Sequence, residues 1–201
     1  MDATATTRPR ITGAREHAIF DATLTLLREV GYDRLTMDAV ATAAKAGKAS
    51  LYRRWRTKGD LVVDALTRCE PVTSADTGSV RGDLLGLACS PGGMVDQAPI
   101  GVMASLMTAM HHDHELRTAF EQRFVGPRRA AARAVFERGR ARGEIHPDAD
   151  IDLLVDILPS MVVHRLLLRG QHPTPDLVGR IVDHVVLPAG RCPSVPSDPL
   201  S

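Results

Sequence analysis

The chain has 201 residues, 44% of them hydrophobic, 24% charged and only 3% aromatic. This composition is typical of one large or two small globular domains with cores of mainly aliphatic side chains. No apolar run is long enough to span a bilayer, and residues 1–10 lack the apolar segment of a signal peptide. The three cysteines form no CxxC pair, so we expect a cytoplasmic protein with neither a disulfide framework nor a zinc site.

Positive charge is concentrated in the N-terminal third of the chain. Residues 1–68 hold 12 Lys or Arg against 8 Asp or Glu, whereas the remainder holds 13 against 16. A basic segment joined to an acidic one is typical of a protein that binds DNA at one end. Residues 1–10 are expected to form a flexible arm, which either reaches DNA with its two arginines or is a plain disordered tail.

Three helices are predicted over the basic segment. Apolar residues recur at helical spacing over residues 14–30, and Gly31 ends this pattern. Thr36 is a good N-cap for a second helix over residues 37–44. After a four-residue turn, residues 49–55 form a third, short helix. Two short helices joined by a tight turn predict a helix-turn-helix motif.

The third helix lies in the stretch KASLYRRWRTKGDL, residues 48–61, which holds the only tryptophan, Trp55, and one of the two tyrosines, Tyr52. The same stretch holds five cationic side chains and a single acid, Asp60. Cations bind the DNA backbone, and a rigid ring can present a polar tip to a phosphate. The alternative is a solvated basic surface over a core tryptophan, which local composition leaves open.

These motifs, in register from about residue 10 to residue 66, resemble the DNA-binding domain of the TetR family of transcriptional repressors. The matching residues are Gly31, Tyr32, Leu35, Thr36, Met37, Ala39, Val40, Ala41, Leu51, Tyr52, Arg53, Arg54, Trp55, Lys58 and Leu61. The chain departs from the family in the turn, where Lys45 replaces a usual glycine and Gly47 a usual Ser or Thr. If Lys45 adopts a positive φ, its backbone is strained.

The resemblance implies an all-α protein with a helix-turn-helix DNA-binding domain at residues 11–70. A helical ligand-binding and dimerisation domain would follow at residues 80–188, and a disordered tail at residues 189–201. Such a homodimer binds a palindromic operator in double-stranded DNA and is released by a small-molecule effector. The residues expected to contact DNA are Thr36, Lys48, Ala49, Ser50, Tyr52, Arg53, Arg54 and Lys58. Among them, Tyr52 and Lys58 are expected to bind phosphates and Arg54 to read bases, whereas Trp55 is expected in the core.

Beyond a break at residues 71–79, helices are expected over residues 80–88 and 100–112. The second helix ends in the sequence HHDH, residues 111–114, where only His111 and His114 have a helical spacing suited to metal binding. No P-loop, GxSxG or HExxH motif occurs. We therefore expect no cofactor, no metal and no enzyme; the distant alternative is a helical, metal-dependent enzyme that uses His111, His112 or His114 with Asp113.

A long helix is expected over residues 115–142, with a kink or restart at the Gly126-Pro127 step. One of its faces is basic and lacks aromatic residues, so we expect it to be solvated. This face consists of Arg128, Arg129, Arg133, Arg138, Arg140 and Arg142.

The last two expected helices, over residues 148–169 and 174–187, are apolar around most of their surface. Such helices need burial on two sides, one in their own domain and one against a second copy of the chain. The predicted dimer interface consists of Leu154, Leu158, Val162, Ile181 and Val185. This region resembles, more loosely, the C-terminal domain of one actinobacterial-type branch of the family.

An apolar ligand pocket is expected within the C-terminal domain. Its predicted lining is Met103, Leu106, Met107, Met110, His111, Phe120, Phe124, Leu158, Val162 and His164. This lining favours a neutral or weakly polar hydrophobic ligand, oriented by the two histidines. The alternative is that these side chains fill a core, and that the protein is a dimeric DNA-binding protein without a ligand.

Overall fold

A computed structural model describes residues 13–67, 76–90, 93–96 and 100–193. Within these ranges every regular element is helical, which confirms the predicted all-α class. None of the helices in the described part of the chain is both long and apolar enough to cross a membrane. The helices are α1 (Ala14–Arg34), α2 (Met37–Ala43), α3 (Lys48–Arg54), α4 (Lys58–Thr67), α5 (Val80–Cys89), η1 (Met94–Asp96), α6 (Ile100–Ala109), α7 (His114–Phe120), η2 (Glu121–Val125), α8 (Gly126–Ala141), α9 (Ile151–Arg169), α10 (Pro175–Ile181), η3 (Val182–Val186) and α11 (Leu187–Gly190).

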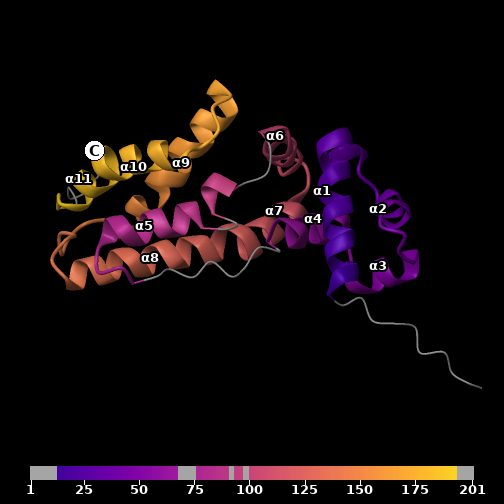
Figure 1. The fold of residues 1–201 in the computed structure, drawn as a ribbon, viewed down its shortest axis with the longest axis horizontal. Coiled ribbons are helices and arrows are strands. Elements are labelled where there is room, and N and C mark those ends of the chain that lie inside the picture. The colour runs from indigo at the N-terminus through magenta and orange to yellow at the C-terminus, as the bar shows by residue number, and fades with distance from the viewer. Residues whose placement is uncertain (1–12, 68–75, 91–92, 97–99, 194–201) are drawn as a thin grey trace, which may run out of the picture.

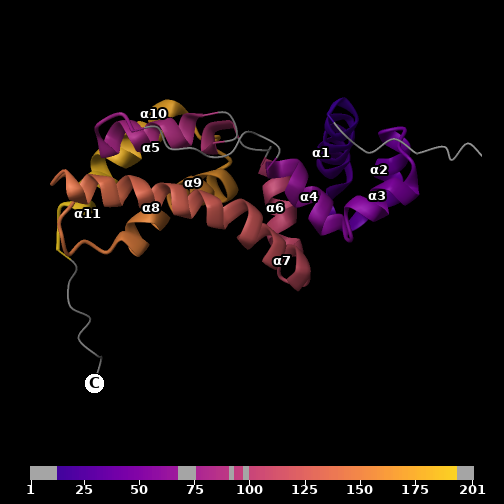
Figure 2. The ribbon, with the colours of Figure 1, turned by 90° about the horizontal axis from the view of Figure 1, so that it is seen from below.

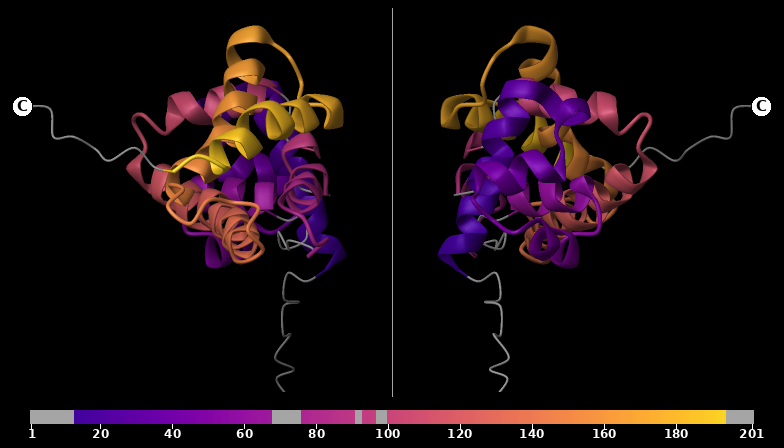
Figure 3. Two further views of the ribbon diagram at one scale, coloured as in Figure 1. Left: turned by 90° about the vertical axis from the view of Figure 1, so that its left-hand side faces the viewer. Right: turned by 90° about the vertical axis from the view of Figure 1, so that its right-hand side faces the viewer.

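The molecule is elongated (Figure 1). Helices α1–α3 form one end, α5 and α8–α11 form the other, and α4, α6 and α7 lie between them. Seen from below, α8 runs along the length of the C-terminal part (Figure 2). The two end views show α9–α11 at the front of one end and the N-terminal helices at the front of the other (Figure 3).

Local signals in the sequence set the boundaries of the first three helices. The Thr36 hydroxyl accepts a hydrogen bond from the backbone N of Ala39 at 3.1 Å, which confirms the predicted N-cap of α2. Gly31 has φ 75° and interrupts α1, as its position at the end of the apolar pattern indicated. Lys45, in the turn between α2 and α3, has φ 50°. The chain therefore places a lysine in a backbone conformation that favours glycine.

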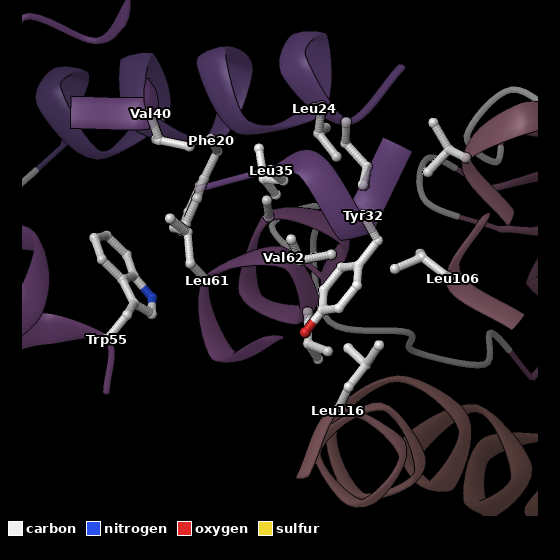
Figure 4. Close-up of a cluster of buried hydrophobic side chains, with 14 of the residues drawn as sticks. Phe20, Leu24, Tyr32, Leu35, Val40, Trp55, Leu61, Val62, Leu106 and Leu116 are labelled. Atoms are coloured by element: carbon white, nitrogen blue, oxygen red, sulfur yellow. The ribbon is translucent and has the colours of Figure 1, made fainter. Parts of the chain in front are cut away.

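The hydrophobic side chains form two clusters, and the first crosses the predicted domain boundary. It joins α1–α4 to α6, α7 and η2. Figure 4 shows Tyr32 of α1 between Val62 of α4, Leu106 of α6 and Leu116 of α7. The second cluster is formed by α5, α8, α9, α10 and η3. Helices α1–α4 thus share a core with the helices that follow the break at residues 71–79, of which residues 71–75 lie outside the described ranges.

The long helix expected over residues 115–142 is continuous, but it contains the π-helical segment η2 immediately before Gly126-Pro127. Proline lacks an N–H group and its ring displaces the carbonyl four residues earlier. A π turn, which is wider than an α turn, accommodates this locally without ending the helix. The same arrangement recurs where η3 precedes Pro188, so the proline allows the helix to continue into α11.

The tail expected over residues 189–201 begins later than predicted, because helix α11 includes residues 189 and 190. Residues 189 and 190 are helical, and Gly190 is buried. A Cβ atom added at Gly190 would lie 2.6 Å from Cδ1 of Ile145, so the absence of a side chain permits this close packing. The backbone N of His146 also donates to the Gly190 carbonyl at 2.8 Å. Residues 194–201, like the expected arm at residues 1–10, lie outside the described ranges.

Asp83 on α5 is a fully buried acid that connects three parts of the C-terminal region. Its Oδ1 accepts hydrogen bonds from the backbone N and Oγ1 of Thr77, each at 2.6 Å, and its Oδ2 accepts one from Nη2 of Arg138 at 3.0 Å. Burial by itself raises the pKa of Asp83, but the bonds from Thr77 and Arg138 outweigh it and hold the pKa below the usual 3.8. The charged carboxylate therefore stabilises the packing of α5 on α8.

Candidate DNA-binding surface and effector cavity

Helix α3 lies at the end of the molecule opposite α9–α11 (Figure 1), and it is anchored by two buried side chains. Leu51 is fully buried, and Trp55, just after the helix, is 1% exposed. The Trp55 ring meets Phe20 of α1 edge-on at 5.7 Å, and its Nε1 donates to Oδ2 of Asp64 at 2.8 Å. This confirms the expectation that Trp55 belongs to the core, and it fixes which face of α3 is turned to solvent.

The predicted DNA-contacting residues lie on that solvent face or beside it. Thr36, Lys48, Ala49, Tyr52, Arg53 and Arg54 are exposed, and Ser50 and Lys58 are partly buried. Tyr52 is 54% exposed, although a large aromatic side chain is usually buried to a greater extent. Helix α3 is short, lies at one end of the molecule and carries an exposed aromatic ring among cationic side chains. These are features of a helix that enters the major groove of DNA.

Two acids from neighbouring helices hold cations of α3, and the sequence stretch alone did not reveal them. Nζ of Lys48 lies 2.7 Å from Oδ2 of Asp38 on α2, and Nη2 of Arg54 lies 2.9 Å from Oε1 of Glu16 on α1. Both pairs are exposed enough for solvent to screen them, so each contributes little to folding stability. They do orient the two cationic side chains, and DNA phosphates would compete with the acids for them.

Lys58 has partners within the protein at the position where a phosphate contact was expected. Its Nζ donates to the carbonyl oxygens of Tyr32 at 2.9 Å and Asp33 at 3.2 Å, and lies 4.3 Å from the centre of the Tyr32 ring. The ammonium group thus satisfies carbonyls near the end of α1, where the helix dipole favours a cation. A phosphate contact would have to share this ammonium group with α1.

Polar contacts connect α1 and α4 to α7 and η2. The Tyr32 hydroxyl donates to Oδ2 of Asp113 at 2.8 Å, and burial, followed by this bond, raises the pKa of Tyr32 above its usual value. Arg123 of η2 pairs with Asp60 and Asp64 of α4. Burial alone raises the pKa of Asp60, but its bonds with Arg123 and Thr57 hold that pKa below the usual value.

Within the HHDH sequence, Asp113 has a structural role. Oδ1 of Asp113 accepts from the backbone N of Leu116 at 2.8 Å, which caps α7, while Oδ2 binds Tyr32. His111, His112 and His114 are exposed. Across the described residues, no group of three or more His, Cys, Asp or Glu side chains is arranged to hold a metal ion.

A cavity of about 330 Å³ lies between α6, the α7–η2–α8 helix and α9. Five of the predicted lining residues are there: Met103, Met107, Phe120, Phe124 and Val162. The other five predicted lining residues do not line this cavity. Leu106 is buried in the first hydrophobic cluster, and Met110 packs against that cluster. Leu158 borders a smaller cavity of about 50 Å³, and the structure leaves His111 and His164 exposed rather than turned into the larger one.

The cavity is also lined by residues that sequence reasoning missed: Met94, Val125, Arg128, Arg129, Ala132, Val155, Asp156, Pro159, Ser160 and Val163. The arginine face of α8, expected to be solvated, therefore lies partly against the cavity and partly against α9. Arg129 pairs with Asp156 and Arg133 with Asp152, so these two side chains link α8 to α9. The ring of Phe124 lies 3.8 Å beneath the Arg128 guanidinium, whose Nη1 donates to the Phe124 carbonyl at 2.9 Å.

Four of the five residues predicted at the dimer interface are buried within the protomer. Leu154, Leu158, Val162 and Ile181 are 3–6% exposed and belong to the second hydrophobic cluster, and Val185 is half-buried. Another face of α9 is less covered. Its Leu153, His164 and Leu168 are exposed, whereas Ile157 and Met161 are partly buried against the second cluster. All five fall within an arc of ~80° at 3.6 residues per turn. Leu153 is 63% exposed and Leu168 is 76% exposed.

Comparison with known proteins gives the same assignment for both parts of the chain. The family model described as "Bacterial regulatory proteins, tetR family" matches residues 19–65. The model described as "Tetracyclin repressor-like, C-terminal domain" matches residues 74–185. Together they span the helix-turn-helix and the helices that surround the cavity.

Similar proteins include an uncharacterised HTH-type transcriptional regulator of Mycobacterium tuberculosis, which is 36% identical over 91% of each chain. A DNA-binding transcriptional repressor named TetR from Mycobacteroides abscessus is 34% identical over 86% of this chain and 92% of its own. The crystal structure of the TetR family transcription regulator SCO0332 superposes with a TM-score of 0.61 at 30% identity, covering 90% of this chain and all of that one. The chain belongs to the TetR family of DNA-binding transcriptional regulators, which are not enzymes.

Proposed function

We propose that this protein is a homodimeric repressor that binds a palindromic operator and is released from it by a small molecule. The observation that carries the DNA-binding part is the exposed side of α3, with Tyr52 uncovered among Lys48, Arg53 and Arg54 while Leu51 and Trp55 anchor the helix. One α3 from each protomer would enter successive major grooves. The protein would act in the cytoplasm, where the DNA of a bacterial cell lies.

Within this surface, the start of α3 would reach base edges and its flanks would bind the backbone. Lys48, Ala49, Ser50 and Arg54 are the proposed base-reading residues, and Tyr52, Arg53 and Lys58 the proposed phosphate ligands, with Thr36 capping the helix that supports them. For Lys48 and Arg54, binding requires exchange of Asp38 and Glu16 for DNA. Such exchange favours sites at which the new contacts replace the ion pairs fully.

The dimer would form through the uncovered apolar face of α9. Leu153 and Leu168 are two of the three large hydrophobic side chains that stand out as exposed among the described residues; Tyr52 is the third. A groove lined by Leu153, Ile157 and Ala189 lies between the start of α9 and α11 and continues this face. Pairing α9, α10 and α11 with their copies would cover it as a helical bundle.

The cavity of about 330 Å³ supports release by an effector over the alternative of a ligand-independent dimer. Its volume falls within the range of small-molecule sites, and its walls are mainly apolar. One wall is the α7–η2 segment, whose Arg123 holds Asp60 and Asp64 of the DNA-binding helices. A ligand could release DNA only by its difference in affinity between the DNA-bound and free arrangements.

The test is DNA binding by the purified full-length protein. We expect a mobility shift and a footprint on a DNA fragment that carries the gene's own upstream region. Arg54→Ala should relax the base preference at one position of each half-site, at a cost of ~1–3 kcal/mol. Arg133→Ala, on α8, serves as the matched control and should leave the footprint unchanged. Equal binding of the wild-type protein to unrelated DNA would overturn the proposal.

A further inference from the structure

The turn between α2 and α3 holds a lysine in a backbone conformation that favours glycine. Lys45 has φ 50°, an angle that a glycine would adopt without a steric penalty. Two backbone hydrogen bonds fix this conformation: the N of Lys45 donates to the Thr42 carbonyl at 3.1 Å, and the N of Ala46 donates to the Ala41 carbonyl at 2.8 Å. Together they form the Schellman motif that ends α2, in which the residue after the C-cap is left-handed. The fold therefore explains the angle, but it does not explain the choice of lysine.

The side chain of Lys45 has no contact in the protein that would offset this strain. It is exposed, and within the described part of the chain its ammonium group makes no hydrogen bond, ion pair or contact with an aromatic ring. A cation near the end of α2 is favoured by the helix dipole, but α2 has only 7 residues and solvent screens an exposed charge. Strained residues are concentrated at binding sites, where the strained position serves the contact.

The cations of the turn and of α3 with the residues that follow it fall into two groups. One group is held by acids or carbonyls of the protein and consists of Lys48, Arg54 and Lys58. The other group has no such partner among the described residues and consists of Lys45, Arg53 and Arg56. A cation of the second group can bind a phosphate without first leaving an acid or a carbonyl, so its charge is fully available to DNA.

The turn lies where a helix-turn-helix motif meets the DNA backbone. Helices α2 and α3 are the outermost helices at their end of the molecule (Figure 1). When the start of the recognition helix enters the major groove, the preceding helix crosses the backbone, so the turn between them faces the phosphates at the edge of the groove. Lys45 lies three residues before Lys48, with which α3 begins. Its flexible four-carbon side chain can extend from the turn to one of these phosphates.

We propose that Lys45 is a phosphate ligand in the complex with DNA, and that its strained position is kept because it places a free ammonium group at the edge of the groove. The inference rests on the proposed function, because it takes α3 as the helix that enters the groove. A phosphate contact carries no base sequence information. Lys45 should therefore contribute to the affinity for every DNA site and not to the choice among sites.

Two substitutions separate the charge of Lys45 from its backbone conformation. Asn tolerates the left-handed region, so Lys45→Asn removes the charge and keeps the turn. We expect this variant of the full-length protein to lose affinity for operator and random DNA alike, by about fivefold for each lysine at physiological salt and about thirtyfold for a dimer. The slope of log affinity against log salt concentration should fall by about one unit per chain. Lys45→Arg keeps the charge and should retain the wild-type slope.

Lys45→Gly removes the strain and the charge together, so stability and DNA binding should change in opposite directions. The thermal midpoint should rise, while DNA binding should weaken as much as in Lys45→Asn. Arg133→Gln is the matched control, because it changes the net charge by the same amount on α8, where Arg133 pairs with Asp152. It should leave the DNA affinity and the salt slope unchanged.

The outcomes distinguish this inference from the function on which it rests. If Lys45→Asn keeps the wild-type salt slope while Arg53→Gln lowers it, the DNA-binding surface stands and the inference is refuted. If neither substitution changes the slope, α3 does not lie at the DNA, and the proposed function fails together with the inference. A lower thermal midpoint in Lys45→Asn with unchanged DNA binding would leave the lysine as a helix-end charge alone, and would also refute the inference.

Discussion

Replacing Leu168 by alanine should weaken the dimer without destabilising the protomer. Leu168 is 76% exposed in the single chain, so most of its side chain is available for burial. Complete burial of a leucine contributes roughly 1.5–3 kcal/mol, and three quarters of that is about 1–2 kcal/mol. A two-fold axis places the residue in the interface twice, which gives about 2–4 kcal/mol per dimer. The dissociation constant should therefore rise roughly 30- to 1,000-fold.

Ile181→Ala is the matched substitution with the opposite expected result. Ile181 is 3% exposed and packs in the second hydrophobic cluster, so its truncation should lower the free energy of unfolding by about 2–5 kcal/mol. The dimer that remains folded should dissociate much as the wild type does. Sedimentation equilibrium over a concentration series, with urea unfolding of dilute protein, measures both quantities. A wild-type dissociation constant for Leu168→Ala would refute the assignment of this face of α9.

Three further substitutions test local parts of the structure. Lys45→Gly should raise the free energy of unfolding by about 0.5 kcal/mol, because relief of the left-handed backbone at φ 50° exceeds the added entropy of the unfolded chain; a lower thermal midpoint would contradict this. Asp83→Asn should cost about 3 kcal/mol at neutral pH. Since the pKa of Asp83 is held below 3.8 in the folded state, its contribution is complete above that value and is lost as the pH falls through the folded pKa. The difference between wild type and Asp83→Asn should therefore shrink in acid, and a constant difference across urea titrations at several pH values would refute it. Lys58→Ala should weaken binding to specific and random DNA alike and lower the salt slope by about one unit; it should also lower stability, because Lys58 bonds the carbonyls of Tyr32 and Asp33. An unchanged salt slope would leave Lys58 with the structural role alone.

The helices and the helix-turn-helix could be predicted from the sequence because their signals are local. The N-cap at Thr36, the break at Gly31 and the apolar spacing along α1 each depend on residues within a turn or two. Even the unusual φ of Lys45 could be anticipated, since the expected turn required the conformation that a glycine supplies. Resemblance to a family added the pairing of these elements and the roles of the exposed residues.

Which face of α9 packs within the protomer could not be predicted by the same reasoning. Helix α9 has apolar residues on two faces, represented by Leu154 and Leu158 on one and Leu153 and Ile157 on the other. Periodicity indicates that both faces must be buried, but it does not show which one packs in the protomer's own core. That choice depends on contacts with α5, α8 and α10, which are distant in the sequence.

The charged residues that line the cavity could not be predicted from the sequence for a related reason. Arg128 and Arg129 follow a proline on a polar stretch of α8, where arginines usually lie in solvent. Their place in the cavity is set by the π-helical segment before Gly126 and by Asp156, which lies 27 residues beyond Arg129. Neither influence has a local sequence signal, whereas the methionine and phenylalanine positions follow simple helical spacing.

Selection of binding sites from random double-stranded DNA by the full-length protein tests the central claim most directly. We expect enrichment of one inverted repeat, with half-sites spaced so that two α3 helices can enter successive major grooves. Arg54→Ala should lose the preference at a single position of each half-site, and Leu168→Ala should lose the requirement for two half-sites at low protein concentration. Recovery of unrelated sequences by the wild-type protein, with no repeat in common, would contradict the assignment of α3 as the sequence-reading helix.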